Sequence, residues 1–254
     1  MIKAERQDKV RQLLEEQGTV SVKEISDALG VSDMTIRRDL EELASLGEIE
    51  RVHGGARSAQ SRPHAMLRHE YSHSEKRTKQ AEEKLQIARR AVELIEEGST
   101  IFLGTGTTVE QMASMLPAFR LRIVTNSLSV FNLLEEREDC DLCLVGGMYR
   151  RRTAAFVGPT AEDTLRALGI DAAFLGANGI LDGDVSTSNM DEGRIQQLAF
   201  SKADSRYLIA DSSKIGKRDF FTFCRLDSLD AVVCEPSITA EDRTAIEEHT
   251  QVIC

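Results

Sequence analysis

The chain has 254 residues, of which 41% are hydrophobic and 29% charged, with a formal net charge of −10 at pH 7. It contains no apolar run near the roughly 18 residues of a membrane-spanning helix, and its first residues lack the apolar stretch of a signal peptide. Its five cysteines are an odd number for a disulfide framework, so we expect reduced thiols in a cytoplasmic protein with no membrane contact. The acidic balance argues against indiscriminate binding to nucleic acid, although a local basic face can still bind DNA.

Three amphipathic segments near the N-terminus predict three helices. Their apolar residues recur at helical spacing over residues 4–17, 21–29 and 32–46. Ser21 and Glu24 stand at the positions of a capping box, and Gly30 is placed to end the second helix. Because only two residues separate the second helix from the third, the pattern is typical of a helix-turn-helix.

The third predicted helix presents basic side chains away from its apolar face. Ile36, Leu40 and Leu43 fall on one side at about 100° per residue, whereas Arg37 and Arg38 point away from it. In a helix-turn-helix, residues at the start of the second helix contact base edges and phosphates of DNA. The alternative is a three-helix packing module whose arginines are merely solvated.

A short strand and a glycine turn follow the third helix. Ile49 and Val52 alternate with charged residues before Gly54 and Gly55, which is the pattern of the wing in a winged helix. The residues that we expect to contact double-stranded DNA are Ser32, Met34, Thr35, Arg37, Arg38, Arg51 and His53.

Three runs in this region are familiar. Val20-Ser21-Val22-Lys23-Glu24-Ile25, Thr35-Ile36-Arg37-Arg38-Asp39-Leu40 and Arg51-Val52-His53-Gly54-Gly55-Ala56 together resemble the DeoR family of bacterial transcription regulators. The resemblance implies a winged helix-turn-helix DNA-binding domain over residues 1–57, a linker over 58–77 and an α/β sensor domain over 78–254. It also implies operator DNA as a partner and transcriptional regulation, most often repression, as the function.

The predicted linker is polar, basic and aperiodic, as expected for a hinge between domains. It contains His69-Glu70-Tyr71-Ser72-His73, which has the H-E-x-x-H spacing of a zinc protease. The flanking charges would leave such a helix exposed, and no third ligand is evident nearby. We therefore expect a solvated linker and no metal site.

From residue 82 the pattern changes to helices that alternate with short apolar runs. The runs cover residues 100–103, 121–125, 141–145, 172–175, 206–210 and 231–234. Runs that are apolar throughout fit strands buried on both faces, and their alternation with helices predicts an α/β domain with a mostly parallel sheet. In such sheets, ligands bind beyond the carboxyl ends of the strands.

Small and polar residues follow five of these strands. Gly104-Thr105-Gly106-Thr107-Thr108 joins the first strand to a helix, where converging N–H groups and hydroxyls suit the phosphate of a small molecule. A tight turn with capping threonines is the alternative. The loop has neither a Walker lysine nor G-x-G-x-x-G, so we expect no nucleotide and no other cofactor. The residues that we expect to bind an effector are Gly104, Thr105, Gly106, Thr107, Thr108, Asn126, Gly147, Arg150, Gly176, Ala177, Asn178, Gly179 and Lys214.

The DeoR resemblance extends to this rim, because sensor domains of the family are similar to ribose-5-phosphate isomerase. It adds Thr187 and Glu192 to the expected effector site. Gly104, where many members carry Asp, and Ser186-Thr187-Ser188-Asn189 resemble the repressors of the lactose phosphotransferase system. That likeness implies tagatose 6-phosphate, or a similar phosphorylated ketose, as the effector. We expect a homodimer or homotetramer, since one helix-turn-helix reads few bases.

The alternative function is a sugar-phosphate isomerase or deaminase with an accessory DNA-binding domain. Similar isomerases carry Gly-Ala-Asp-Glu where this chain has Gly176-Ala177-Asn178-Gly179, so both acids are absent. Because Asn178 cannot act as a base near neutral pH, we expect no enzyme activity, with Asp191 and Glu192 the nearest remaining acids in the sequence.

A redox or zinc sensor is a third class, suggested by Cys140-Asp141-Leu142-Cys143. No second cysteine pair has suitable spacing, and Cys143 lies in a predicted strand. We therefore expect both cysteines to serve packing.

Overall fold

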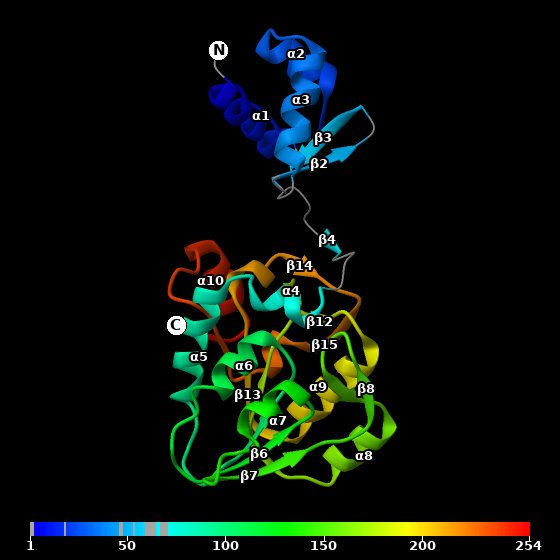
Figure 1. The fold of residues 1–254 in the computed structure, drawn as a ribbon. Coiled ribbons are helices and arrows are strands. Elements are labelled where there is room, and N and C mark those ends of the chain that lie inside the picture. Colours follow the sequence, from blue (N-terminus) through cyan, green and yellow to red (C-terminus); the bar gives the residue numbers. More distant parts are fainter. Residues whose placement is uncertain (1–2, 18, 46–47, 53, 59–64, 67–70) are drawn as a thin grey trace. The chain divides into compact units, whose positions relative to one another are not determined.

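The computed structural model describes residues 3–17, 19–45, 48–52, 54–58, 65–66 and 71–254. The chain forms two compact units, Met1–Ala65 and Met66–Cys254 (Figure 1). Each unit is described separately below. Among the described residues, no helix combines the length and the apolar character that crossing a membrane requires.

The N-terminal unit is a winged helix-turn-helix, as the sequence predicts. Its helices are α1 (Lys3–Gln17), α2 (Val22–Leu29) and α3 (Asp33–Ser45), and its antiparallel strands β1 (Thr19–Ser21), β2 (Ile49–Val52) and β3 (Gly55–Ser58) pair in the order β1-β3-β2. The capping box of Ser21 and Glu24 is present, and Gly30 ends α2 with φ of 64°, a conformation that glycine adopts without strain.

The core of this unit consists of the apolar faces that the three helices share. Ile36, Leu40 and Leu43 of α3 pack with Val10 and Leu14 of α1, and all are buried. An ion pair absent from the prediction also joins these helices: Arg6 Nη2 donates to Asp39 Oδ1 at 3.1 Å, and Arg6 Nε donates to Asp39 Oδ2. Asp39 is therefore a buried structural residue on the face of α3 turned toward α1.

The C-terminal unit is built on a parallel sheet of seven strands. These are β5 (Thr100–Leu103), β6 (Leu121–Thr125), β7 (Cys140–Leu144), β10 (Ile170–Leu175), β13 (Ala203–Ile209), β16 (Ala231–Val233) and β17 (Gln251–Ile253). Their order is β17-β16-β13-β10-β5-β6-β7, and every neighbouring pair is parallel. The α/β fold class is thus confirmed; the only strand of this sheet that the apolar runs did not predict is β17.

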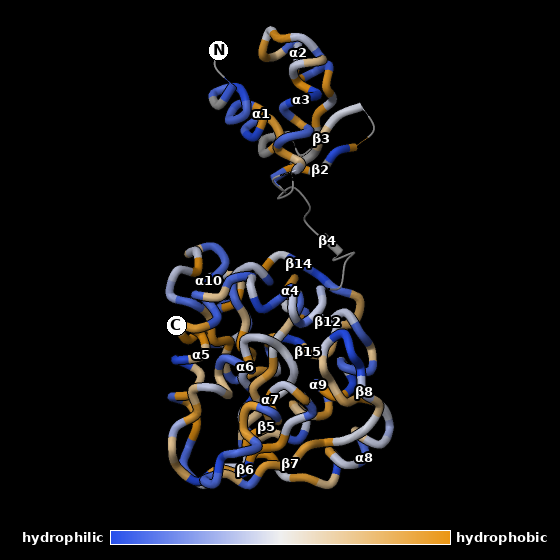
Figure 2. Tube along the Cα trace, in the orientation of Figure 1, coloured by the Kyte–Doolittle hydropathy of each residue, from blue (hydrophilic) through white to orange (hydrophobic). Residues whose placement is uncertain are grey.

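Helices cover both faces of the sheet, which explains why its strands read as continuous apolar runs. On one face lie α5 (Ala81–Val92), α6 (Thr107–Ala113) and α7 (Leu128–Leu134); on the other lie α8 (Pro159–Arg166), α9 (Met190–Lys202) and α10 (Ala240–Glu247). Alternate residues of β5 enter different cores: Ile101 and Leu103 pack with the first set of helices and Phe102 with the second. Figure 2 shows hydrophobic residues gathered along the strands.

Smaller elements extend the rim of the sheet. β11 (Gly179–Leu181), β12 (Asp184–Thr187) and β15 (Phe221–Arg225) form a three-stranded antiparallel sheet, and β8 (Met148–Arg150) pairs with β9 (Ala155–Val157). The remaining elements are the helix α4 (His73–Arg77), the short strands β4 (Ala65–Met66) and β14 (Lys217–Arg218), and the 3-10 turns η1 (Ser212–Lys214) and η2 (Leu226–Ser228).

The strand order reverses between β5 and β10. From β5 the chain proceeds outward through β6 and β7, and it then returns to place β10 on the other side of β5. At such a switch point the loops after the two strands diverge and leave a crevice at the carboxyl edge of the sheet. The fold therefore places the loops after β5 and β10 at the expected ligand position.

Candidate functional site

The start of α3 presents an exposed polar surface in the N-terminal unit. Met34 is 76% exposed, and Arg37 and Arg38 are both exposed. Thr35 is half-buried, and its hydroxyl lies 2.9 Å from Ser32 Oγ, which fixes the first turn of the helix. These four side chains, with Ser32, have the exposure and placement that contacts in a DNA groove require.

The predicted wing residues differ from one another. Arg51 Nη1 donates to the main-chain oxygen of Arg37 at 3.3 Å and lies 3.5 Å from Glu41 Oε1. Its guanidinium therefore braces α3, and direct contact with DNA stays a prediction for this residue. His53 lies outside the described residues.

The C-terminal unit contains a cavity of about 560 Å³ at the switch point. Its walls come from the loop after β5, the ends of β10 and β13, the helix α9, and the segment that contains α4 and the start of α5. The predicted effector residues that line it are Thr105, Gly106, Thr107, Thr108, Gly176, Ala177, Asn178, Thr187, Glu192 and Lys214.

Five other predicted residues do not line the cavity: Gly104, Asn126, Gly147, Arg150 and Gly179. Packing explains the three glycines, because an added Cβ would lie 2.5 Å from Leu175 Cδ2 at Gly104, 2.7 Å from the Val157 oxygen at Gly147 and 2.4 Å from the Lys217 oxygen at Gly179.

The other two of these residues hold their neighbours in place. Asn126 Nδ2 donates to the Phe156 oxygen at 3.0 Å and thereby joins the end of β6 to β9. Arg150 Nη1 donates to Glu192 Oε1 at 3.0 Å. It therefore acts on the cavity through Glu192.

One wall of the cavity was absent from the predicted site. Tyr71, His73, Lys76, Thr78, Lys79, Gln80 and Lys84 all line it, and the first three fall in the stretch expected to be a solvated linker. In the sequence, the only sign that this segment belongs to an anion site is its charge, since residues 58–90 carry eight basic and four acidic side chains. Periodicity says nothing about a segment that docks through polar contacts. Asp211 and Ser213, from the polar stretch predicted after the strand at residues 206–210, also line the cavity. Gln196, Lys217 and Asp219 line it without having been predicted.

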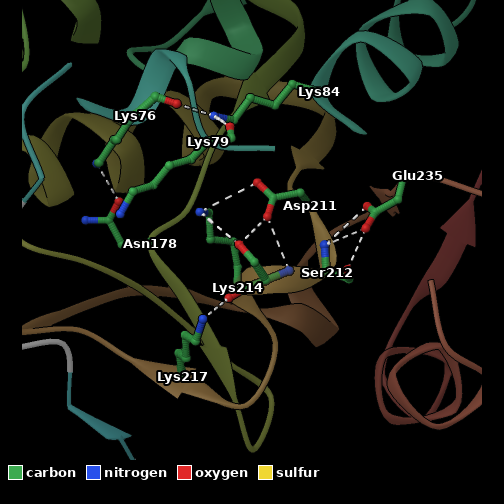
Figure 3. A network of polar contacts seen from close by, with 10 residues as sticks. Lys76, Lys79, Lys84, Asn178, Asp211, Ser212, Lys214, Lys217 and Glu235 are labelled. Atoms are coloured by element: carbon green, nitrogen blue, oxygen red, sulfur yellow. Dashed lines mark hydrogen bonds and ion pairs between the residues drawn. The ribbon is translucent and has the colours of Figure 1, made fainter. Parts of the chain in front are cut away.

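Five lysines meet at the cavity, and Figure 3 shows their polar contacts. Lys76 Nζ donates to Asn178 Oδ1 at 2.8 Å, and Lys214 Nζ lies 3.6 Å from Asp211 Oδ2. The other three are Lys79, Lys84 and Lys217. Within the described part of the chain, none of these three has a carboxylate within 4.0 Å of its ammonium group.

The surroundings of Lys84 and Lys217 disfavour the positive charge of these two side chains. Burial lowers the pKa of Lys84 to about 8, against an ordinary value of 10.5, and the nearby charges of Lys214 and Lys76 add to the effect. Burial also lowers the pKa of Lys217, again with a contribution from Lys214. Asp211 offsets part of this effect on both lysines. Cations without a paired carboxylate, in a cavity that can admit a ligand, indicate a site for an anion.

The wall formed by α9 carries groups suited to hydroxyls. Glu192 is 6% exposed and accepts hydrogen bonds from Arg150 and from Thr153 Oγ1. Gln196 Nε2 donates to the Gly176 oxygen at 3.1 Å, which leaves Gln196 Oε1 buried with no hydrogen-bond partner among the described residues. A carboxylate and an amide oxygen fixed in this way can accept hydrogen bonds from a polyol.

The metal and thiol alternatives gain no support. No cluster of His, Cys, Asp and Glu able to hold a metal ion occurs among the described residues, and His69 and Glu70 lie outside them. Cys140 and Cys143 are free thiols on the edge strand β7, each half-buried. Burial raises the pKa of Cys140, which makes it less reactive at neutral pH.

Comparison with known proteins places both units in one family. The model of the DeoR-like helix-turn-helix domain matches residues 6–62, and that of the DeoR C terminal sensor domain matches residues 79–235. A lactose phosphotransferase system repressor of Staphylococcus epidermidis is 43% identical over 100% of both chains. A protein of the same name from Staphylococcus aureus is 44% identical over 92% of this chain and 93% of its own.

Similarity to solved structures is weaker. Ribose 5-phosphate isomerase A from Methanocaldococcus jannaschii is 19% identical, with a TM-score of 0.41, over 54% of this chain and 55% of its own. The family assignment depends on the sequence matches, which confirm the resemblance found in the recognition helix and the wing. The chain belongs to the DeoR family, with its helix-turn-helix and sensor domains in the N-terminal and C-terminal units.

Proposed function

We propose that this chain represses transcription of an operon for sugar catabolism, binding operator DNA through α3 and a phosphorylated sugar in the cavity. One observation carries the second half of the proposal. Lys79, Lys84 and Lys217 share a cavity in which, among the described residues, no carboxylate pairs with any of them. A phosphate dianion would supply the missing counter-charge, whereas a neutral sugar would not.

The cavity also supports a sugar rather than a free phosphate. Its volume of about 560 Å³ lies in the range of sites for small molecules. Glu192, Gln196 and Thr187 also line the cavity, and each can bond a hydroxyl. A ligand with a phosphate and several hydroxyls would thus pair with the lysines and also bond these three side chains.

As the effector we propose tagatose 6-phosphate or a similar phosphorylated ketose. The relatives named lactose phosphotransferase system repressors support this choice, together with the sequence likeness at Gly104 and residues 186–189. Operator binding is assigned to Thr35, Arg37 and Arg38, with Met34 and Ser32 beside them. A homodimer or homotetramer is proposed because one recognition helix reads a short site and two give useful specificity.

A screen of ligands by thermal shift tests this function. Tagatose 6-phosphate should raise the melting temperature of the full chain, and unphosphorylated tagatose should not. The active compound should then release the chain from a fragment of its own promoter, followed by fluorescence anisotropy. A chain that ignores every phosphorylated sugar, or that binds one without a change in DNA affinity, would refute the proposal.

A sugar-phosphate isomerase remains the second candidate because Glu192 lies in the cavity as a possible base. Its bond with Arg150 and the amide at Asn178 argue against this role, since a proton shuttle needs a carboxylate free to accept a proton. Exchange of carbon-bound protons on tagatose 6-phosphate in heavy water, lost in Glu192→Gln, would favour the enzyme. We expect no exchange above that of a heat-inactivated sample.

A further inference from the structure

The helix α4 is attached to the C-terminal unit without an apolar anchor. No residue of α4 is buried, and residues 71–80, which we name the strap, are all exposed or half-buried. A segment that buries so little apolar surface gains little from the hydrophobic effect. Polar contacts must therefore hold it in place.

Several polar contacts hold the strap, among them the hydrogen bond from Lys76 Nζ to Asn178 Oδ1 at 2.8 Å and that from the His73 main-chain N–H to the Arg152 oxygen at 3.0 Å. On one side, His73 Nε2 lies 2.5 Å from Glu110 Oε1, and Arg77 Nη2 lies 3.2 Å from Glu110 Oε2. Burial alone would raise the pKa of Glu110, but His73, Ser129 and Arg77 together bring it below its ordinary value. On the cavity side, Lys84 Nζ donates to the main-chain oxygens of Lys76 and Lys79, at 2.5 Å each.

The cavity side of the strap is also a place of repulsion. Lys76 and Lys79 of the strap line the same cavity as Lys84, Lys214 and Lys217 of the body of the unit, and Figure 3 labels all five. The charge of Lys76 contributes to the lowered pKa of Lys84, and that of Lys79 contributes to the lowered pKa of Lys217. Without an anion, the like charges thus oppose the hydrogen bonds and ion pairs that hold the strap to the body.

We propose that the strap closes on the phosphorylated ligand, because its phosphate acts as the counterion between the lysines of the strap and those of the body. The inference rests on the proposed function of the cavity as a phosphate site. It concerns how binding changes the protein: a phosphate between the two groups of lysines converts repulsion into attraction on both sides.

The position of the strap in the chain gives this closure a consequence. The strap is the first stretch of described residues in the C-terminal unit after β4, so the chain enters this unit through it. Closure of the strap therefore fixes the point at which the chain enters the C-terminal unit. Ligand binding is in this way coupled to the N-terminal unit through chain connectivity, which requires no contact between the DNA-binding surface and the cavity.

Hydrogen exchange of the full chain tests the strap directly. Saturating tagatose 6-phosphate should slow exchange of the amides in residues 73–80 by at least about fivefold, a change within the usual range of coupling between sites. Inorganic phosphate, at higher concentration, should give the same pattern because it supplies the same counterion. Exchange in α10 should be unchanged, since α10 does not line the cavity.

Arg77→Ala probes the strap from outside the cavity. Arg77 does not line the cavity and is 60% exposed, so the variant should fold. Losing the Arg77–Glu110 pair should speed exchange of the strap amides in the ligand-free chain. It should also weaken tagatose 6-phosphate binding, because more of the binding free energy is then needed to order the strap. The matched control is Arg89→Ala on the exposed face of α5, which should change neither.

The outcomes separate the two proposals. If tagatose 6-phosphate binds, by calorimetry, without slowing exchange in the strap, the strap proposal is wrong and the proposed function stands. The same holds if Arg77→Ala behaves like Arg89→Ala in both measurements. If calorimetry detects binding of neither tagatose 6-phosphate nor inorganic phosphate, the phosphate site and the strap fail together.

Discussion

Lys76 donates a hydrogen bond of 2.8 Å to the side-chain oxygen of Asn178, a residue 102 positions away in the chain. Asn178 in turn donates to Asp219 Oδ2 at 2.9 Å, so the amide is fixed on both sides. This contact joins α4 to the end of β10, beside the reversal of strand order. It makes the segment after the DNA-binding unit part of the sensor cavity.

Replacing Arg38 should weaken operator binding without affecting the sensor. Arg38→Ala removes an exposed cation from the start of α3, and we expect a loss of about 1–3 kcal/mol in binding free energy. Fluorescence anisotropy with a promoter fragment measures the loss. Lys9→Ala on α1 removes the same charge from an exposed site and serves as the control. Equal losses in both variants would mean that Arg38 contributes only general charge.

Replacing Lys217 should weaken binding of the sugar phosphate and spare DNA binding. Lys217→Gln removes one ammonium group that has no carboxylate partner in the described structure, and a charge-assisted hydrogen bond contributes about 1.5–3 kcal/mol. Calorimetric titration with tagatose 6-phosphate measures the change. Lys202→Gln, at the end of α9 and outside the cavity, is the matched control. An unchanged dissociation constant in Lys217→Gln would place the phosphate elsewhere.

The affinity for a sugar phosphate should fall as the pH rises above about 8. Lys84 has a pKa of about 8, so it is charged below that pH and loses its attraction for phosphate above it. Burial lowers this pKa most, Lys214 and Lys76 lower it further, and Asp211 and Glu83 raise it. Because the second pKa of a phosphate is about 6, affinity should be highest between these two values.

Titration with tagatose 6-phosphate at pH 7 and pH 9 measures this dependence. In Lys84→Met the loss of affinity between the two pH values should be smaller, because one titrating group is gone. Lys217, whose pKa is also lowered, accounts for the remainder. A pH dependence of equal size in Lys84→Met and the unchanged chain would show that Lys84 does not face the phosphate.

A side chain at Gly104 should cost stability through packing. A Cβ there would lie 2.5 Å from Cδ2 of the fully buried Leu175, and crowding of this kind costs about 1–3 kcal/mol. Thermal unfolding of ligand-free Gly104→Ala should show a lower melting temperature. Gly169→Ala, where a Cβ meets no atom within 4 Å, should show no decrease. A Gly104→Ala chain of full stability that no longer binds sugar phosphate would instead place Gly104 in the binding site.

Local patterns in the sequence were sufficient for the three helices of the N-terminal unit, for six strands of the parallel sheet and for ten of the residues that line the cavity. The apolar spacing of α3, the Ser21–Glu24 capping box and the runs that became β5 and β6 depend on neighbours a few positions apart. The loops after β5 and β10 were located because parallel strands end at one edge of a sheet, whatever the rest of the fold does. The family followed from residues 35–40 and 51–56 for the same reason, since a motif is a local property.

Only the tertiary structure decided which of these residues line the cavity and which others join them. Gly104, Gly147 and Gly179 were predicted to bind the effector, yet none of them lines the cavity, and an added Cβ at each would crowd an atom of a distant strand or loop. From the sequence alone, Lys84 is expected to be a charged position on an amphipathic helix, and Lys76 is expected to belong to a solvated linker. Both come to the cavity because α4 and α5 dock on the switch point through contacts between residues far apart in the chain. Polar docking of this kind leaves no periodicity in the sequence, since it depends on single charges meeting in space rather than on a repeated apolar face.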